Sequence, residues 1–366
     1  RAFARFVQGL GHGSLALLYD RGVVVDETSD PSAPELVEYG VLMDTALAYL
    51  AEAAELADGH GWTIPANWMS VEVPADQLAR LAHSFAARFR AAVARTPAER
   101  STVDWAAVIA DVDAGITADW VMDLDAGAGW FAEYLLYANA IGWSQESYFI
   151  VGMADGSGSY QEWLTQGRPP ESRLPNADSD GDGTPDPTLI VTADTRFPQG
   201  STLAEQEASP GSLYAIPMGL TGQLGGDDRA WDIRQVWFRP ERGSWRWSYY
   251  WAVEAEPYIH GVDSHWPVMT RAELRLLKAE GLLRRDEEAS AAALVNTSRV
   301  AAGLSPTDGA GTNVECVPRL PDGPCGGLME MLKWEKRLET RMKGPFLASW
   351  YFDGRGWGDL YAGTFL

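Results

Sequence analysis

The segment NADSDGDGTPDP contains acidic residues with the spacing of calcium ligands. Asp178, Asp180 and Asp182 fill positions 1, 3 and 5 of a calcium-loop pattern, and the Thr184 carbonyl and Asp186 follow at positions 7 and 9. Ca²⁺ prefers hard oxygen ligands that converge from one tight loop. These residues are therefore predicted to bind Ca²⁺.

The calcium pattern is incomplete at its last position. Position 12 is normally a bidentate Glu, but Leu189 stands there, so water or a ligand from another part of the chain has to complete the coordination. A solvated acidic loop without a metal is the alternative interpretation.

Aromatic side chains form the second group of candidate ligand-binding residues. The chain has 16 Trp, and the faces of such rings stack on the C–H faces of sugar rings while polar neighbours bind the hydroxyls. Trp residues in loops are predicted to be exposed platforms for sugars. The candidate ligand-binding residues are Trp62, Trp68, Trp163, Trp237, Trp245 and Trp266.

A predicted hairpin strand carries some of these rings. Trp245, Trp247, Tyr249 and Trp251 alternate along the chain and so share one face of the strand, with Trp237 across the hairpin. Large rings along one side of a strand favour burial, so this face is predicted to pack between hairpin and helices. A sugar-binding face is the alternative.

Few residues are arranged as in a catalytic site. None of the 5 His stands in an H-E-x-x-H pattern, and the sequence has no G-x-S-x-G motif or phosphate-binding loop. His12 and His83 fall in helical patterns and are predicted to pack. His260 and His265 flank Asp263, where a metal site is conceivable but ordinary polar structure is expected. The chain is predicted not to be an enzyme.

The 2 cysteines, Cys316 and Cys325, enclose a short loop that contains Pro and Gly residues. A turn there brings the thiols together, and two thiols without a nearby His cannot make a zinc site. A disulfide is predicted, which indicates an environment outside the cytosol, and two free thiols are the alternative.

The composition restricts the partners. With 29 Lys+Arg against 51 Asp+Glu, the formal net charge is −22, which argues against nucleic acid or an anionic membrane surface as a partner. No apolar run approaches the ~20 residues of a membrane-spanning helix. The chain begins at Arg1 inside a helical pattern, so we expect it to be part of a longer precursor.

Amphipathic helices are predicted on both sides of an irregular middle part. Small residues recur in two of them and favour close helix pairing of the tetratricopeptide kind. Thr102 or Asp104 is expected to cap one helix, and Gly303 to end another. The predicted helices cover residues 3–18, 34–58, 74–95, 102–116, 269–284, 287–302 and 328–342.

The predicted fold class is mainly α, with tetratricopeptide-like helix pairs and a large irregular, loop-rich insertion that carries short strands. We expect a single domain in three parts. Residues 1–119 form an N-terminal helical part, residues 120–265 the aromatic-rich insertion, and residues 266–366 a C-terminal helical part with the cysteine loop.

Three stretches of the sequence carry a family resemblance: ARFVQGLGHGSLALLYDRGVVVDE, MTRAELRLLKAEGLLRRDEEASAAALVNTSRVAAGLSP and WEKRLETRMKGPFLASWYFDGRGWGDL. They resemble the SusD/RagB family of surface-exposed glycan-capture lipoproteins. The second stretch is similar to that family's long helix pair, and the third to its Glu-Arg-x-x-Glu helix with the Asp-x-Arg-x-Trp-Gly segment that follows, here Asp353, Arg355 and Trp357. Arg337, Arg355 and Asp353 are expected to form a structural ion-pair network.

The resemblance implies a location, a partner and a ligand. The location is the cell surface at the outer membrane, and the partner is a TonB-dependent transporter of the SusC type, over which the protein closes as a lid. The ligand is an oligosaccharide or a similar nutrient. The alternative is a structural subunit of an extracellular filament or surface assembly, which has the same fold and self-associates.

Overall fold

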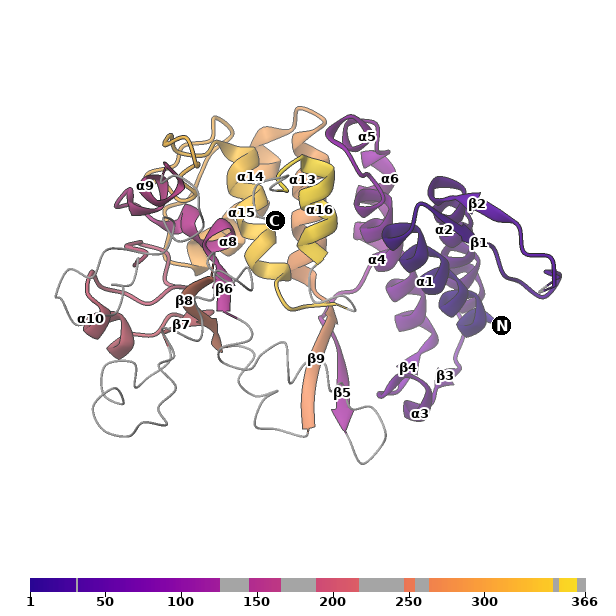
Figure 1. Cartoon of the computed structure of the whole chain (residues 1–366). Helices are drawn as coiled ribbons and strands as arrows, with labels where there is room; N and C mark the ends of the chain where they lie inside the picture. The colour runs from indigo at the N-terminus through magenta and orange to yellow at the C-terminus, as the bar shows by residue number, and fades with distance from the viewer. Residues whose placement is uncertain are drawn as a thin grey trace. The chain divides into compact units, whose positions relative to one another are not determined.

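This computed structural model describes residues 1–30, 32–125, 145–165, 189–216, 247–253, 263–344 and 349–360. Over these residues the chain is mainly helical, as predicted, with short antiparallel strands (Figure 1). The chain divides into two compact units. Unit 1 comprises residues 1–130, 265–295 and 332–362, and unit 2 comprises residues 131–264, 296–331 and 363–366.

Unit 1 is built on a series of packed helices. Helix α1 (Ala2–Leu18) packs on α2 (Tyr39–Ala57), and α2 packs on α4 (Ala75–Ala92). Helix α4 packs in turn on α6 (Trp105–Ala114), and α6 on α13 (Arg271–Leu283). Figure 1 shows the first four of these helices side by side.

Glycines allow the close approach of α1 to its neighbours. A Cβ at Gly9 would lie 2.6 Å from Leu50 Cγ of α2, and one at Gly13 would lie 2.2 Å from a ring carbon of Phe89 on α4. Both distances are far below van der Waals contact, so a larger residue at either position would force the neighbouring side chain or helix to shift. The predicted pairing of α4 with α6 is present, and α1 adds a close contact that depends on glycine.

Local signals define several helix ends. Asp104, not Thr102, caps α6, because its carboxylate accepts a hydrogen bond from Ala107 N. Gly303 has φ +77° just after α14 (Glu288–Ala301), as expected of a glycine that ends a helix. The remaining helices of this part of the chain are α5 (Pro97–Ser101), α15 (Leu328–Thr340) and α16 (Ser349–Trp357).

Short strand pairs connect the helices of unit 1. Strands β1 (Arg21–Val23) and β2 (Leu36–Glu38) pair antiparallel, so residues 36–38 form a strand where the sequence pattern predicted helix. The other strands and the short helix between two of them are β3 (Thr63–Ile64), α3 (Ala66–Met69), β4 (Val73–Pro74), β5 (Trp120–Asp125) and β9 (Asp263–Met269). Strand β3 pairs with β4, and β5 with β9.

Unit 2 contains a small antiparallel sheet in which β8 (Trp247–Ala252) lies between β6 (Gln145–Ser147) and β7 (Tyr214–Ala215). The predicted hairpin partner of β8, residues 236–238, lies outside the described residues. The short helices of this unit are α8 (Tyr148–Val151), a 3-10 turn (Gly152–Ala154), α9 (Ser159–Thr165) and α10 (Leu203–Ala208). Trp251 is 6% exposed, which agrees with the predicted core position of this ring.

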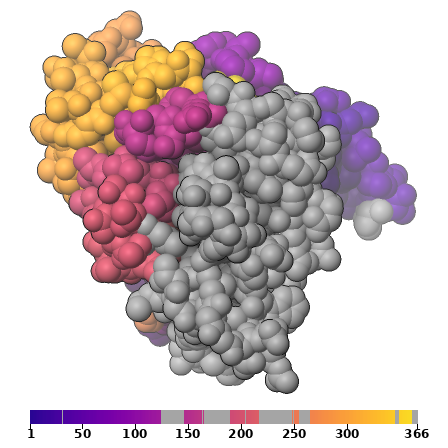
Figure 2. Space-filling view, turned by 60° about the vertical axis from the view of Figure 1, so that its left-hand side comes forward, coloured from indigo at the N-terminus to yellow at the C-terminus, as the bar shows by residue number. Residues whose placement is uncertain are grey.

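The buried carboxylate of Asp155 organises the turn before α9. Its Oδ1 accepts hydrogen bonds from Ser157 N and Val191 N, both at 3.1 Å. Its Oδ2 accepts from Gly158 N at 3.1 Å and Tyr160 N at 3.2 Å. The side chain thereby joins residues 155–160 to residue 191, and Figure 2 shows residues 145–165 directly against residues 189–216.

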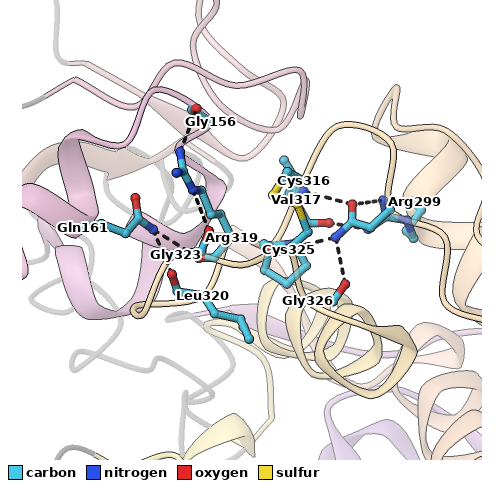
Figure 3. The surroundings of a disulfide bond; sticks show 12 residues. Gly156, Gln161, Arg299, Cys316, Val317, Arg319, Leu320, Gly323, Cys325 and Gly326 are labelled. Carbon is cyan, nitrogen blue, oxygen red and sulfur yellow. Dashed lines mark hydrogen bonds between the residues drawn. A yellow bond between two sulfur atoms is a disulfide. The ribbon is translucent and has the colours of Figure 1, made fainter.

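Cys316 and Cys325 form a disulfide, as predicted (Figure 3). Asn313 holds the loop that they close, because its amide oxygen accepts from Val317 N at 3.0 Å and its amide nitrogen donates to Gly326 O at 3.0 Å. Arg319 N donates to Met153 O at 2.8 Å. The loop is therefore fixed both internally and to the segment that precedes Asp155. Among the described residues, no helix combines the length and hydrophobicity needed to cross a membrane.

Candidate ligand-binding site

Trp68 is the predicted platform residue with the most exposed ring among those whose side chains the structure describes. It is 55% exposed and lies on α3, which the pairing of β3 with β4 holds at its base. The ring stands 5.2 Å from the ring of Phe3 on α1, centroid to centroid, with an angle of 39° between the planes. A neighbouring ring from a second element restricts the motion of the indole, so Trp68 is a partly fixed aromatic surface.

An open groove of about 920 Å³ lies beside this ring pair. Phe3, Ala4 and Val7 of α1 form its apolar side together with Trp68. Polar side chains from α1 and from the loop after β1 complete the lining. An apolar face with a few convergent polar groups is the general composition of a small-molecule site. We call this feature the Trp68 groove.

The polar side of the Trp68 groove is held by Arg5. Its guanidinium donates to Gln8 Oε1 at 2.7 Å and to Glu27 Oε1 at 2.9 Å, and its Nε lies 2.8 Å from Glu52 Oε2. The hydrogen bond from Arg5 lowers the pKa of Glu27, and the same bond raises the pKa of Arg5. The pair thus stays charged at mildly acidic pH and presents both donors and acceptors to a ligand.

His12 fixes the loop that carries Glu27. Its Nε2 accepts a hydrogen bond from Val25 N at 2.9 Å, so in the neutral ring the proton is on Nδ1, which donates to Gln8 O at 2.7 Å. The ring also lies 5.4 Å from the ring of Tyr49 on α2. The predicted packed position of His12 is confirmed, and through Gln8 and Val25 it positions two parts of the groove.

The other predicted platform residues differ from Trp68. Trp266 is 4% exposed, so the expectation of an exposed loop ring is wrong there, because residue 266 lies in β9 and packs inward. Trp62 is half-buried next to β3. Trp163 lies in α9, but its side chain is outside the described part. Trp237 and Trp245 lie outside the described residues.

The predicted calcium ligands at residues 178–186 also lie outside the described residues. Within the part of the chain that the structure describes, no group of three or more His, Cys, Asp or Glu side chains gathers as metal ligands would. His83 hydrogen-bonds to Asp111 at 2.8 Å, and His265 to Asp123.

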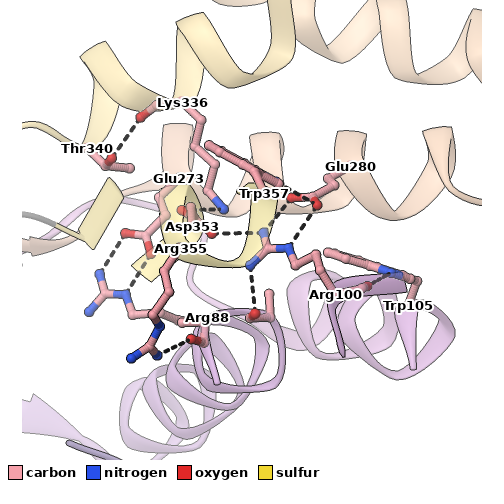
Figure 4. Close-up of polar contacts among 12 residues, drawn as sticks. Arg88, Arg100, Trp105, Glu273, Glu280, Lys336, Thr340, Asp353, Arg355 and Trp357 are labelled. Atoms are coloured by element: carbon pink, nitrogen blue, oxygen red, sulfur yellow. Dashed lines mark hydrogen bonds and ion pairs between the residues drawn. The ribbon is translucent and has the colours of Figure 1, made fainter. Parts of the chain in front are cut away.

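A second polar cluster lies buried within unit 1 (Figure 4). Arg100 donates to Glu280 Oε2 at 2.6 Å and to Asp353 Oδ1 at 2.8 Å, and Lys336 Nζ lies 2.9 Å from Asp353 Oδ2. Trp357 Nε1 donates to Glu280 Oε1 at 2.9 Å. We call these five residues the buried ion cluster.

The charges of the buried ion cluster stabilise one another. Burial alone would raise the pKa of Glu280, but the charge and hydrogen bonds of Arg100 lower it to about 2. Burial likewise lowers the pKa of Arg100, but Glu280 and Asp353 more than offset this and raise it. The cluster is enclosed by helices and has a structural role.

The structure assigns Asp353 different partners from those expected from the sequence. Arg355 was expected to join an ion-pair network with it, but Arg355 donates to the backbone carbonyls of Leu17 at 3.0 Å and Ala92 at 3.3 Å. The cations that pair with Asp353 are Arg100 and Lys336. An ion-pair network around Asp353 is therefore present. The C-terminal sequence alone does not reveal that Arg100 is one of its members.

Comparison with known proteins gives results at the level of structure alone. No protein-family model and no curated protein sequence matches this chain. A SusD-like protein of Bacteroides fragilis is similar over 98% of this chain and 68% of its own length, with 15% identity and a TM-score of 0.49.

Two further solved structures give similar values. A SusD superfamily protein of Bacteroides vulgatus shows 14% identity and a TM-score of 0.45, over 97% of this chain and 66% of its own. A SusD homolog of Bacteroides thetaiotaomicron shows 13% identity and a TM-score of 0.47, over 98% of this chain and 67% of its own. The chain thus spans about two thirds of the length of these three solved proteins.

Proposed function

We propose that this chain is a non-enzymatic binding protein that captures an oligosaccharide or a similar nutrient in the Trp68 groove. The observation that carries the proposal is the half-exposed Trp68 ring, which lies at a tilt against the Phe3 ring beside an open groove. A pyranose ring laid on the indole would bury its C–H face, and its hydroxyls would face Gln8 and Glu27. Because Arg5 already hydrogen-bonds to both Gln8 and Glu27, little ordering is needed on binding.

We also propose that the captured nutrient is passed to a TonB-dependent transporter of the SusC type at the outer membrane, where the protein is held as a surface lipoprotein. The support for this partner and location is the SusD/RagB resemblance of the three sequence stretches. The disulfide agrees with a position outside the cytosol.

Replacing Trp68 by alanine is expected to weaken glycan binding by about 10- to 100-fold, because the stacking surface of the ring contributes about 1.5–3 kcal/mol when it is buried by a ligand. The measurement is calorimetry and tryptophan fluorescence with a panel of neutral and acidic oligosaccharides. The matched control is Tyr351→Ala, which removes another exposed ring, 44% exposed and in contact with Phe352, away from the Trp68 groove.

The control protein should bind as the parent does. If no oligosaccharide of the panel gives heat or a fluorescence change with the parent, capture of a glycan is ruled out. If the parent binds but Trp68→Ala binds equally well, the Trp68 groove is not the site.

We further propose that residues 178–186 bind Ca²⁺, on the support of the alternating carboxylates alone. Calorimetry with Ca²⁺ is expected to show binding to the parent in the range from micromolar to millimolar, and none to the double variant Asp180→Ala with Asp182→Ala. The double variant Asp26→Ala with Asp30→Ala, in another acidic loop, is the control and should bind as the parent does. The absence of heat in the parent would end this proposal.

A further inference from the structure

A small internal cavity lies among α1, α4, α13, α15 and α16 of unit 1. Its volume of about 10 Å³ is of the size that holds one water molecule. We call it the α16 cavity. Its polar lining residues are all 8% exposed or less, so bulk solvent does not hydrate their polar groups. These residues are Arg88, Glu273, Lys336, Ser349 and Asp353.

Arg88 brings a buried donor without an acceptor to this cavity. Its Nε and Nη2 each donate to the Glu273 carboxylate at 2.6 Å, and Nη2 also donates to Val268 O at 2.9 Å. Nη1 lies away from the edge of the guanidinium that faces Glu273, and it has no hydrogen-bond partner among the residues that the structure describes. Because a buried donor without an acceptor is destabilising, native proteins generally supply one, often an ordered water.

A second ion pair lines the same cavity. Lys336 Nζ lies 2.9 Å from Asp353 Oδ2, and both side chains are almost completely buried. An ammonium group has three donors and a carboxylate oxygen has two lone pairs, so this contact leaves hydrogen-bonding capacity on both groups. The Arg88–Glu273 and Lys336–Asp353 pairs therefore meet at one cavity from four helices (Figure 4).

The chemistry of the lining selects a neutral molecule that both donates and accepts hydrogen bonds. The two cations and two anions cancel, so a monovalent ion bound there would be a buried charge without a counter-charge. Water can accept from the cations and donate to the carboxylates, and buried waters typically make about three such bonds. The volume excludes larger neutral molecules. Cavities lined by hydrocarbon alone stay dry, but this one is lined by charges on several sides.

We propose that the α16 cavity binds one ordered water molecule, which accepts a hydrogen bond from Arg88 Nη1 and bridges the Arg88–Glu273 pair to the Lys336–Asp353 pair. Since Lys336 and Asp353 belong to the buried ion cluster, the water joins Arg88 of α4 to that cluster. The inference goes beyond the proposed capture of a glycan and does not depend on it.

Two variants of Ser349 distinguish a hydrated cavity from a dry one. Ser349→Val fills the space with hydrocarbon and leaves Arg88 Nη1 without an acceptor, whereas Ser349→Ala leaves room for the water. The unfolding equilibrium constant of Ser349→Val, from denaturant unfolding, should be at least about tenfold larger than that of Ser349→Ala. The lower helix propensity of valine accounts for about threefold of this difference. In a dry cavity the order would be reversed, because valine would fill a void that alanine enlarges.

Oxygen-17 magnetic relaxation tests the water directly, because it counts the long-lived water molecules inside the folded protein. The parent and Ser349→Ala should hold one more such water than Ser349→Val. A crystal structure of the parent should place a water oxygen within hydrogen-bond distance of Arg88 Nη1. A parent without a water there, an ion in its place, or an equal count in Ser349→Val would overturn the proposal. Loss of glycan binding in Trp68→Ala leaves these results unchanged, so the two proposals fail separately.

Discussion

Replacing Arg100 by methionine should lower the free energy of unfolding of unit 1 by about 3–5 kcal/mol, because it leaves Glu280 and Asp353 buried with one cation fewer. Both side chains of the Arg100–Glu280 pair are completely buried, so water cannot replace the lost partner. Methionine retains most of the volume of the arginine stem, so the effect is that of the lost charge and hydrogen bonds. Denaturant unfolding followed by tryptophan fluorescence measures it.

The control for this variant is Arg90→Met. Arg90 pairs with Asp111 at 2.7 Å, but its side chain is 32% exposed, so the loss should be below about 1 kcal/mol. If the two variants lose the same stability, the buried ion cluster does not stabilise the fold in the way described.

A pH series separates charge from packing in the Arg100 variant. Because the folded-state pKa of Glu280 is lowered to about 2 from an ordinary 4.5, its contribution is fully present above pH 4.5 and is lost as the pH falls toward 2. This corresponds to about 3 kcal/mol. Without Arg100 the pKa of Glu280 rises, so the stability of Arg100→Met should depend much less on pH in this window. An unchanged slope would mean that the variant lost packing alone.

Asp155→Ala should release the turn before α9 and make its backbone amides exchange with solvent at least 100-fold faster. Removing the carboxylate leaves four backbone N–H groups without their acceptor, namely those of Ser157, Gly158, Tyr160 and Val191. Each unsatisfied buried donor costs about 1–3 kcal/mol, so about 3 kcal/mol or more is lost locally. Hydrogen exchange with mass spectrometry resolves this segment separately from unit 1.

Two further variants serve as controls for Asp155→Ala. Asp155→Asn keeps one oxygen acceptor, so it should retain part of the protection of the amides from exchange. Ser157→Ala removes the hydroxyl that donates to Asp155 at 2.8 Å and should change the protection of the amides little. Equal protection in Asp155→Ala and the parent would contradict the role assigned to the carboxylate.

The elements that the sequence predicted well are those defined by nearby residues. The end of α14 at Gly303 follows from a short-range signal, and it is present. The Asp104 cap of α6 is likewise local. Residues 36–38 were predicted as helix because their apolar pattern continues into α2, but pairing with β1 decides their conformation.

Long-range contacts explain most of what the sequence left open. Trp68 could be named as a platform from its loop-like surroundings, but its partner Phe3 lies in another helix and no spacing relates the two. The burial of Trp266 depends on the packing of β9, which periodicity does not reveal. Arg100 was not singled out because its partners are 180 and 253 residues away along the chain.

The span of the buried ion cluster has a consequence for the order in which the protein folds during synthesis. Arg100 leaves the ribosome long before Glu280 and Asp353, and its site cannot close around an unpaired guanidinium without a large desolvation cost. The helices of residues 1–114 are therefore expected to pack fully around Arg100 only after the C-terminal helices supply the anions.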